Sequence, residues 1–136
     1  MSDERSGEDG EPEGSSLITH RSSLKEGVSL FNSSRFWHAH EAWERIWLLA
    51  GGEEKQFLQG LIQLAAAYHH VQRGTYRGGV RLFDSALRRL AAFGPLHDGI
   101  DRAAAVKIAA VHRERIASGA DVAESEYPKL IFSARP

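Results

Sequence analysis

The chain has 136 residues, of which 42% are hydrophobic, and this size and composition suit one domain with a single core. The absence of cysteine excludes disulfide bonds and thiolate metal sites. The net charge is -1, the longest apolar stretch is too short to cross a bilayer, and the amino terminus lacks a signal-peptide pattern. We therefore expect a cytoplasmic protein that does not enter a membrane.

Charge is distributed unevenly along the chain. Residues 1–16 contain six acidic residues and one basic residue, which leaves a net charge of +4 on residues 17–136. A segment rich in Gly, Ser, Pro and Glu cannot bury enough apolar surface to offset its ordering entropy. We therefore expect residues 1–16 to be a disordered acidic leader and residues 17–136 to form one helical-bundle domain.

Helical periodicity and helix-ending signals predict five helices in this domain. Ser23 and Glu26 fit a capping box at the start of the first helix. Glycines follow the second, third and fourth helices, and Thr75 and Asp98 are candidate caps for the fourth and the fifth. The predicted ranges, in order, are 24–31, 35–50, 53–73, 76–93 and 100–118.

No segment shows the alternating polarity of a strand between turn signals, so no strand is predicted. The fold class is therefore all-α: a compact bundle of about five helices, arranged as antiparallel helical hairpins around one central apolar helix, residues 53–73. The apolar residues 127–132 are expected to pack back onto the bundle.

One narrow face of the predicted third helix carries amides and imidazole but no charged residue. It consists of Gln56, Gln59, Gln63 and His70. A solvent-facing stripe normally contains some charged residues, so this composition indicates enclosure. Buried amides need hydrogen-bond partners, because an unsatisfied polar group costs about 1 to 3 kcal/mol.

The second helix offers suitable partners for these amides. At about 100° per residue, His40 falls within its apolar stripe beside Trp47, and Glu44 lies on the flank of the stripe. Glu41 lies further round, and His38 points away to the surface. We expect His40, Glu44 or Glu41 to pair with the glutamines.

Three interpretations of this polar set remain open. In the first, it is a structural hydrogen-bond network that fixes the register of the two helices. In the second, it lines a small pocket, where His40 is the catalytic acid or base and Glu44 or Glu41 orients it. In the third, His40 and Glu44 bind a divalent metal ion together with His69 or His70.

The sequence lacks the motifs of several kinds of catalytic, metal and phosphate site. The sequence contains no HExxH, no Glu-x-x-His pair of the di-iron type, no GxSxG and no glycine-rich phosphate loop. We predict no cofactor, with a divalent metal kept only as the third interpretation. Basic residues on the fourth helix are typical of a solvated face, so a nucleic-acid partner is not expected.

Three motifs overlap the polar set. They are Phe31-Asn-x-x-x-Phe36, Ala39-His40-Glu41-x-Trp43-Glu44-x-x-Trp47 and Phe57-Leu-Gln-Gly-Leu-Ile-Gln63. With them, residues 24–91 resemble the family named domain of unknown function 309. The resemblance implies a compact helical bundle with one central helix, and it implies no activity or cofactor. It marks as characteristic His40, Glu41, Glu44, Trp47, Gln59, Gly60 and Gln63. Gly79 stands where family members tend to have Ala, which costs about 1 kcal/mol of helix stability.

The leading hypothesis is a cytoplasmic helical-bundle protein with a partly enclosed site for a small polar ligand. The proposed binding residues are His40, Glu41, Glu44, Trp47, Gln59, Gln63 and His70. The competing class is a protein-interaction module, in which tetratricopeptide-like helical hairpins present a groove to a partner or to a second copy of the chain, and the polar network is purely structural.

Overall fold

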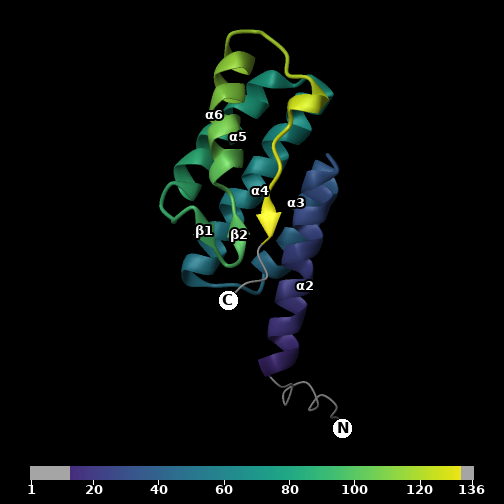
Figure 1. The fold of residues 1–136 in the computed structure, drawn as a ribbon, viewed down its shortest axis with the longest axis vertical. Coiled ribbons are helices and arrows are strands. Elements are labelled where there is room, and N and C mark those ends of the chain that lie inside the picture. Colours follow the sequence, from purple (N-terminus) through teal and green to yellow (C-terminus); the bar gives the residue numbers. More distant parts are fainter. Residues whose placement is uncertain (1–12, 133–136) are drawn as a thin grey trace.

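The computed structural model describes residues 13–132, and within this range it contains five α-helices. They are α2 (Glu13–Asn32), α3 (Phe36–Trp47), α4 (Gly52–Arg73), α5 (Tyr76–Leu90) and α6 (Ala103–Ala117). Consecutive helices run in opposite directions (Figure 1). The predicted all-α class and its antiparallel hairpins are confirmed.

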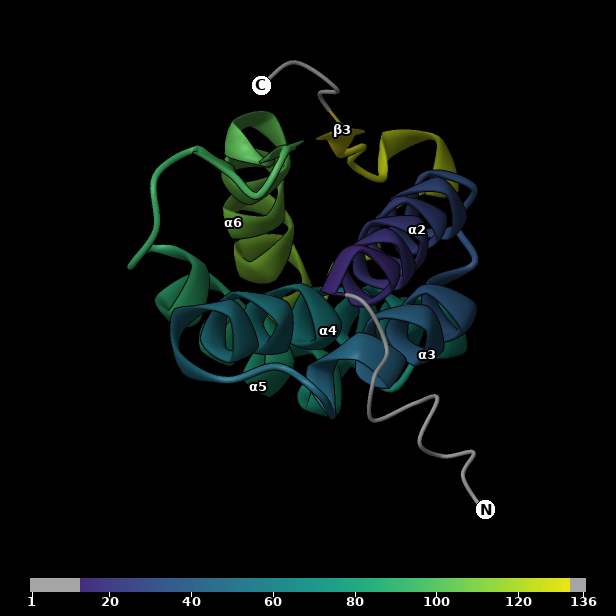
Figure 2. The same ribbon diagram turned by 90° about the horizontal axis from the view of Figure 1, so that it is seen from below.

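The helix α4 is the centre of the bundle. It lies between α3 and α5, while α2 and α6 form a second layer on one side of it (Figure 2). Its fully buried residues include Phe57, Leu58, Leu61, Leu64, Ala65, Ala67 and Tyr68. The predicted central apolar helix is therefore confirmed, with a start one residue earlier than expected. No helix in the described part of the chain is both long and apolar enough to cross a membrane.

The ring of Tyr68 joins four parts of the chain in the core. Its centroid lies 6.2 Å from that of Phe31 in α2, 5.3 Å from that of Phe36 in α3 and 4.9 Å from that of Phe83 in α5. Its hydroxyl group forms a hydrogen bond of 2.7 Å with Nδ1 of His112 in α6. A buried tyrosine needs such a partner for its hydroxyl group.

The helix α2 begins earlier than the sequence predicted. Ser23 lies well inside it, so the proposed capping box is wrong. The residues before Ser23 make tertiary contacts that extend the helix: His20 pairs with two carboxylates, and the guanidinium of Arg21 lies 5.6 Å from the ring centre of Phe132. Residues 13–16 of the predicted leader belong to α2, and residues 1–12 lie outside the described part of the chain.

Between α5 and α6 the chain forms a small hairpin, although no strand was predicted from the sequence. Strands β1 (Leu96–His97) and β2 (Ile100–Asp101) pair in antiparallel fashion around Asp98 and Gly99. Both turn residues have positive φ, 53° and 83°, as a type I′ Asp-Gly turn requires. Asp98 is therefore a turn residue and not a helix cap. Asp101 instead accepts a hydrogen bond of 3.1 Å from the backbone N–H of Ala103 at the start of α6.

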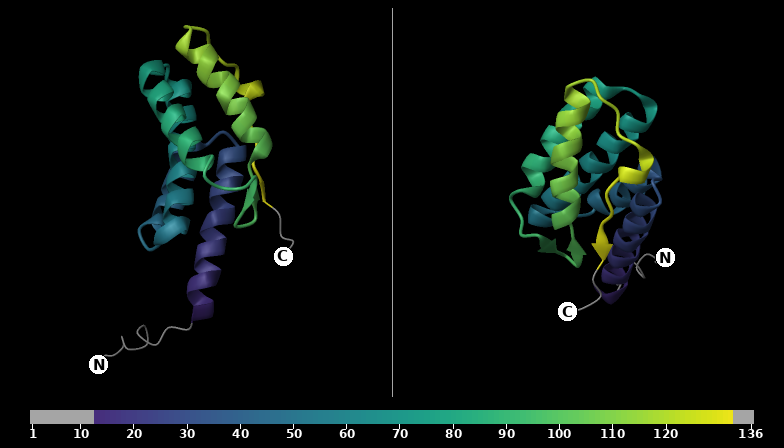
Figure 3. Two further views of the ribbon diagram at one scale, coloured as in Figure 1. Left: turned by 90° about the vertical axis from the view of Figure 1, so that its left-hand side faces the viewer. Right: turned by 45° about the horizontal axis from the view of Figure 1, so that its top comes forward.

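Residues 127–132, here called the C-terminal strap, pack back onto the bundle as predicted. They follow the 3-10 turn η1 (Glu124–Glu126) and end in β3 (Ile131–Phe132), which pairs antiparallel with β2. The Asn32 side chain bonds both backbone groups of Leu130, at 2.7 and 2.8 Å. The strap thus lies between α6 and α2 (Figure 3). The first turns of α2 extend past the ends of the other helices.

Candidate metal centre

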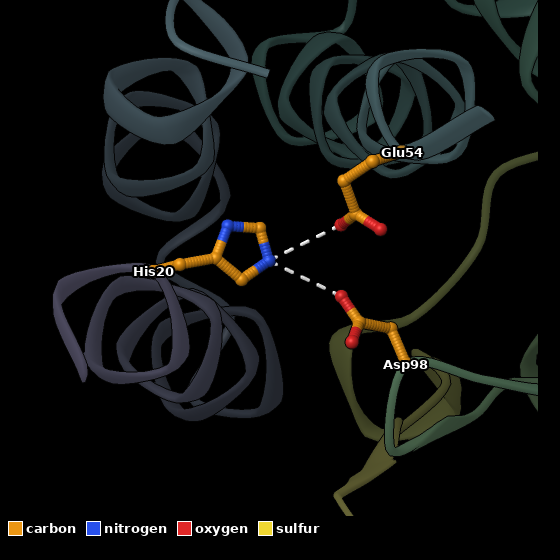
Figure 4. A group of neighbouring side chains, drawn as sticks. All are labelled: His20, Glu54 and Asp98. Carbon is orange, nitrogen blue, oxygen red and sulfur yellow. Dashed lines mark hydrogen bonds and ion pairs between the residues drawn. The ribbon is translucent and has the colours of Figure 1, made fainter. Parts of the chain in front are cut away.

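Three side chains from separate elements meet at the end of the bundle that carries the hairpin. They are His20 of α2, Glu54 in the first turn of α4, and Asp98 in the turn between β1 and β2 (Figure 4). The His20 Nε2 atom lies 3.2 Å from Glu54 Oε2 and 3.2 Å from Asp98 Oδ2. One donor atom from each residue lies within 4.8 Å of the other two.

The backbone explains how each side chain reaches this place. Asp98 occupies a left-handed turn position that Asp tolerates better than most residues. Glu54 lies in the first turn of α4, where the partial positive charge of the helix end favours a carboxylate. His20 is available because α2 continues upstream of the predicted start at residue 24.

The cluster is half-buried and incompletely satisfied. The side chains of His20, Glu54 and Asp98 are 23%, 30% and 25% exposed. Among the described residues, the buried Oε2 atom of Glu54 has no aligned hydrogen-bond donor, although His20 lies within ion-pair distance. A second imidazole is close, with His97 Nε2 3.9 Å from Glu54 Oε1. The ring of His97 is held against Phe57 and Phe93, with centroid distances of 4.3 and 4.8 Å.

Electrostatics at the cluster favour the presence of positive charge. Burial, a hydrogen bond with Asp98 and the negative charge of Asp98 together raise the pKa of Glu54 from 4.5 to about 8. Two neighbouring carboxylates repel each other when both are ionised. Either a shared proton or a cation relieves that repulsion.

The donor spacing also suits a metal ion. Ion–ligand bonds of about 2.0 to 2.2 Å at tetrahedral or octahedral angles place neighbouring ligand atoms about 2.8 to 3.6 Å apart. The two distances of 3.2 Å from His20 fall within this range. The donor atoms of Glu54 and Asp98 lie within 4.8 Å of each other, so the three side chains can meet one ion after a local rearrangement.

The residues proposed from sequence lie elsewhere, along α3 and α4. His40 is half-buried, and its ring stacks on that of Trp37 with a centroid distance of 4.7 Å and an interplanar angle of 9°. Trp47 is also half-buried, with Lys55 Nζ 4.3 Å from its ring centre. Within the described residues, His40 Nδ1 and Trp47 Nε1 are buried without a hydrogen-bond partner. Glu41 and Glu44 are exposed.

The glutamines of α4 find their partner on α5. Arg89 donates from Nε to Gln63 Oε1 at 3.1 Å and from Nη1 to Gln56 Oε1 at 2.5 Å. The expectation that residues of α3 would form hydrogen bonds with Gln56 and Gln63 is therefore wrong, because Arg89 of α5, the other helix beside α4, forms them. Gln59 is half-buried.

The two histidines at the end of α4, His69 and His70, contact different residues. His70 Nδ1 bonds Thr75 Oγ1 at 2.6 Å, and the ring of His69 lies 5.2 Å from that of Trp37. Burial lowers the pKa of His69, and the charge of Arg73 adds to this effect.

Across residues 13–132, His20, Glu54 and Asp98 form the group of potential metal ligands that the structure brings together. The set predicted from sequence, consisting of His40, Glu44, His69 and His70, is not gathered in this way. The predicted set relied on the i, i+4 spacing of one helix, whereas the observed ligands come from three distant segments. The Asp-Gly pair at residues 98–99 was the one local signal that indicated a turn there.

Comparison with known proteins supports the family resemblance. Residues 24–82 match the family model described as Domain of unknown function (DUF309). A segment of 69 residues is 36% identical to an uncharacterized protein of Aquifex aeolicus (strain VF5) and covers 50% of this chain, but only 21% of that protein's length. The crystal structure of a conserved hypothetical protein from Thermus thermophilus is similar with a TM-score of 0.59 and 34% identity, covering 68% of this chain and 94% of that one.

Proposed function

We propose that this chain, which belongs to the family named domain of unknown function 309, is a divalent-metal-binding helical bundle whose ion is held by His20, Glu54 and Asp98. The observation that carries this proposal is the convergence of one imidazole and two carboxylates from three elements, with His20 3.2 Å from each carboxylate. His20 and Asp98 lie outside the segment that the family model matches, so the proposal concerns this chain and not its relatives.

The donor set points to a class of ion. Imidazole with carboxylates suits zinc, manganese or iron, whereas magnesium and calcium prefer ligand sets made of oxygen alone. The partial exposure of all three ligands leaves room for water or a small substrate at the remaining coordination positions. His97 is a candidate fourth ligand after a small movement of its ring.

Calorimetric titration of untagged, chelator-treated protein with Zn²⁺ and with Mn²⁺ tests the proposal. We expect about one equivalent of one of these ions to bind, and the same ion to raise the melting temperature, because a ligand that binds only the folded state stabilises it. Asp98→Asn is the most informative variant, since Asn-Gly supports the same turn while it removes the charge. It should weaken binding about tenfold or more.

A matched histidine pair provides the control. His20→Asn should weaken binding as strongly as Asp98→Asn, whereas His38→Asn, at an exposed position of α3, should leave it unchanged. Circular dichroism checks that each variant is folded. If wild-type protein binds neither ion, or if His38→Asn matters as much as His20→Asn, the cluster is only an ion-pair contact between α2, α4 and the hairpin.

A second candidate function, binding of a small polar ligand between α3 and α4, is supported by a different observation. His40 and Trp47 each bury a polar atom that lacks a partner among the described residues, and such atoms are costly unless a ligand or water satisfies them. Gln59 of α4 is half-buried and is a further candidate to contact such a ligand.

The tryptophan indoles report on this second site. The indole N–H of Trp43 donates to the carbonyl oxygen of Leu24 at 3.2 Å and serves as the internal reference. Titration with small amides and carboxylates, followed by nuclear magnetic resonance, should shift the Trp47 indole signal and leave that of Trp43 in place. If no compound of the panel moves the Trp47 signal selectively, the ligand hypothesis for this site is wrong.

A further inference from the structure

A cleft of about 550 Å³ lies between the start of α4 and the end of α5. The residues that decide its chemistry are Lys55 and Gln56 of α4, Arg89 of α5, and Phe93, which follows α5. None of the three proposed metal ligands lines it. Its volume is within the range of about 300 to 1,000 Å³ that is typical of small-molecule sites.

Arg89 is held in place by neutral groups. Gln63 and Gln56 accept hydrogen bonds from Nε and Nη1, which fixes the plane of the guanidinium. Throughout residues 13–132, Arg89 takes part in no ion pair. Its orientation is therefore set while its positive charge is not paired with a carboxylate, and Nη2 donates no hydrogen bond to any described residue.

A second cationic residue, Lys55, also lines the cleft. Its Nζ atom lies 4.3 Å from the ring centre of Trp47, which does not line the cleft, so a ligand that binds Lys55 exchanges this cation–π contact for an ion pair. Gly52, the first residue of α4, also lines the cleft, so the partial positive charge of the helix end adds to that of the two side chains. The Glu53 carboxylate at the rim opposes part of this charge.

We propose that this cleft binds a small organic phosphate monoester, with the phosphate between Arg89 and Lys55 and the organic group against Phe93. A phosphate monoester carries close to two negative charges at neutral pH, which match the two cations, whereas a carboxylate carries one. The planar fork of an arginine suits two phosphate oxygens at once. Phe93 offers an apolar surface to the rest of the molecule.

Phenyl phosphate is the probe for this site, with inorganic phosphate and benzoate as comparisons. Titrations in the presence of a chelator keep the result independent of metal binding, so either proposal can fail without the other. We expect saturable binding of phenyl phosphate, at least about tenfold weaker binding of benzoate because the second negative charge is lost, and weaker binding of inorganic phosphate because Phe93 is not used.

Neighbouring residues of one helix give a matched control. Arg89→Gln should weaken binding of phenyl phosphate about tenfold or more, while Arg88→Gln, which removes the same charge at an exposed position, should change it less than about twofold. Lys55→Gln is the second variant, with the exposed Lys107→Gln as its control, and it serves if Arg89→Gln does not fold. Absence of binding to wild-type protein, or equal effects of Arg88→Gln and Arg89→Gln, would overturn the proposal.

Discussion

At the scale of single residues, one guanidinium holds the end of α5. Arg102 is 5% exposed, and its Nη2 atom donates to the carbonyl oxygens of Leu90, Phe93 and Gly94. The last carbonyl groups of a helix have no partners within the helix, and burying them unsatisfied is costly. Arg102, the residue just before α6, therefore acts as a cap for the end of α5, although burial lowers its pKa.

We predict that Arg102→Gln lowers the free energy of unfolding by about 2 to 3 kcal/mol, because one buried and two partly buried carbonyl groups lose a charged donor. Urea denaturation followed by circular dichroism measures this. Arg77→Gln, at an exposed position on α5, should change stability by less than about 0.5 kcal/mol. Equal denaturation midpoints for the two variants would contradict the capping role.

Single residues were predicted well only where helix periodicity decides the outcome. His38 was predicted to lie at the surface, and this position is confirmed. The hydrogen bonds from Arg89 to Gln56 and Gln63 were not predicted, since nothing local indicates which neighbouring helix supplies a partner. Whether the proposed polar residues of α3 and α4 bind a ligand stays a prediction.

At the scale of elements, the close contact between α2 and α3 depends on a glycine, Gly27, which has no Cβ atom. A Cβ atom at Gly27 would lie 2.1 Å from Nε1 of the buried Trp43. Alanine normally stabilises a helix by about 1 kcal/mol relative to glycine, but such an overlap forces the helices apart at a cost of about 1 to 3 kcal/mol or more. The steric effect therefore outweighs the helix propensity at this position.

Two glycine-to-alanine substitutions should thus act in opposite directions. We predict that Gly27→Ala destabilises the protein by at least about 1 kcal/mol, whereas Gly79→Ala stabilises it by about 0.5 to 1 kcal/mol. At Gly79 a Cβ atom would meet its nearest neighbour, the Ala67 carbonyl oxygen, at an ordinary 3.5 Å. Thermal or urea unfolding measures both. If Gly27→Ala is as stable as the wild type, the helices are not in close contact there.

Among the elements, those bounded by local signals were predicted best. The helix α4 and its left-handed glycine end, Gly74 with φ 76°, follow directly from the sequence. The upstream half of α2 and the hairpin were missed because tertiary contacts of His20 and pairing with the C-terminal strap stabilise them. Each strand has only two residues, too few to show an alternating pattern.

At the scale of the whole molecule, the buried pair of Tyr68 and His112 connects stability to pH. Burial lowers the pKa of His112, with a further decrease from the charge of Arg115 and an opposing effect of Glu126. The unfolded chain takes up a proton near pH 6.5, whereas folded His112 stays neutral to lower pH. The stabilising contribution is therefore complete above about pH 6.5 and is lost as the pH falls below it.

We predict that His112 lowers the free energy of unfolding by up to about 1.4 kcal/mol per pH unit between pH 7 and pH 5, while the raised pKa of Glu54 contributes in the opposite direction. Urea denaturation at several pH values measures the slope. His112→Gln should remove the His112 contribution and so change the slope, whatever its effect on absolute stability. An unchanged slope in this variant would mean that other groups cause the pH dependence.

The overall architecture was more predictable than the candidate metal centre. Burial of α4 and packing of the strap follow from composition, because burying an apolar segment away from water is favourable. The meeting of His20, Glu54 and Asp98 depends on how three segments close around one end of the bundle. Only the folded chain contains that information.

The C-terminal strap also has a consequence for synthesis of the protein. Asn32 and Leu130 are 98 positions apart, and β3 completes the sheet only after residue 132 has been made. A ribosome therefore releases α2 and α3 long before their final cover exists. Until residues 127–132 have been made, the apolar surface that meets Tyr127 and Leu130 stays uncovered, so synthesis of this segment ends a period in which α2 and α3 are prone to aggregate.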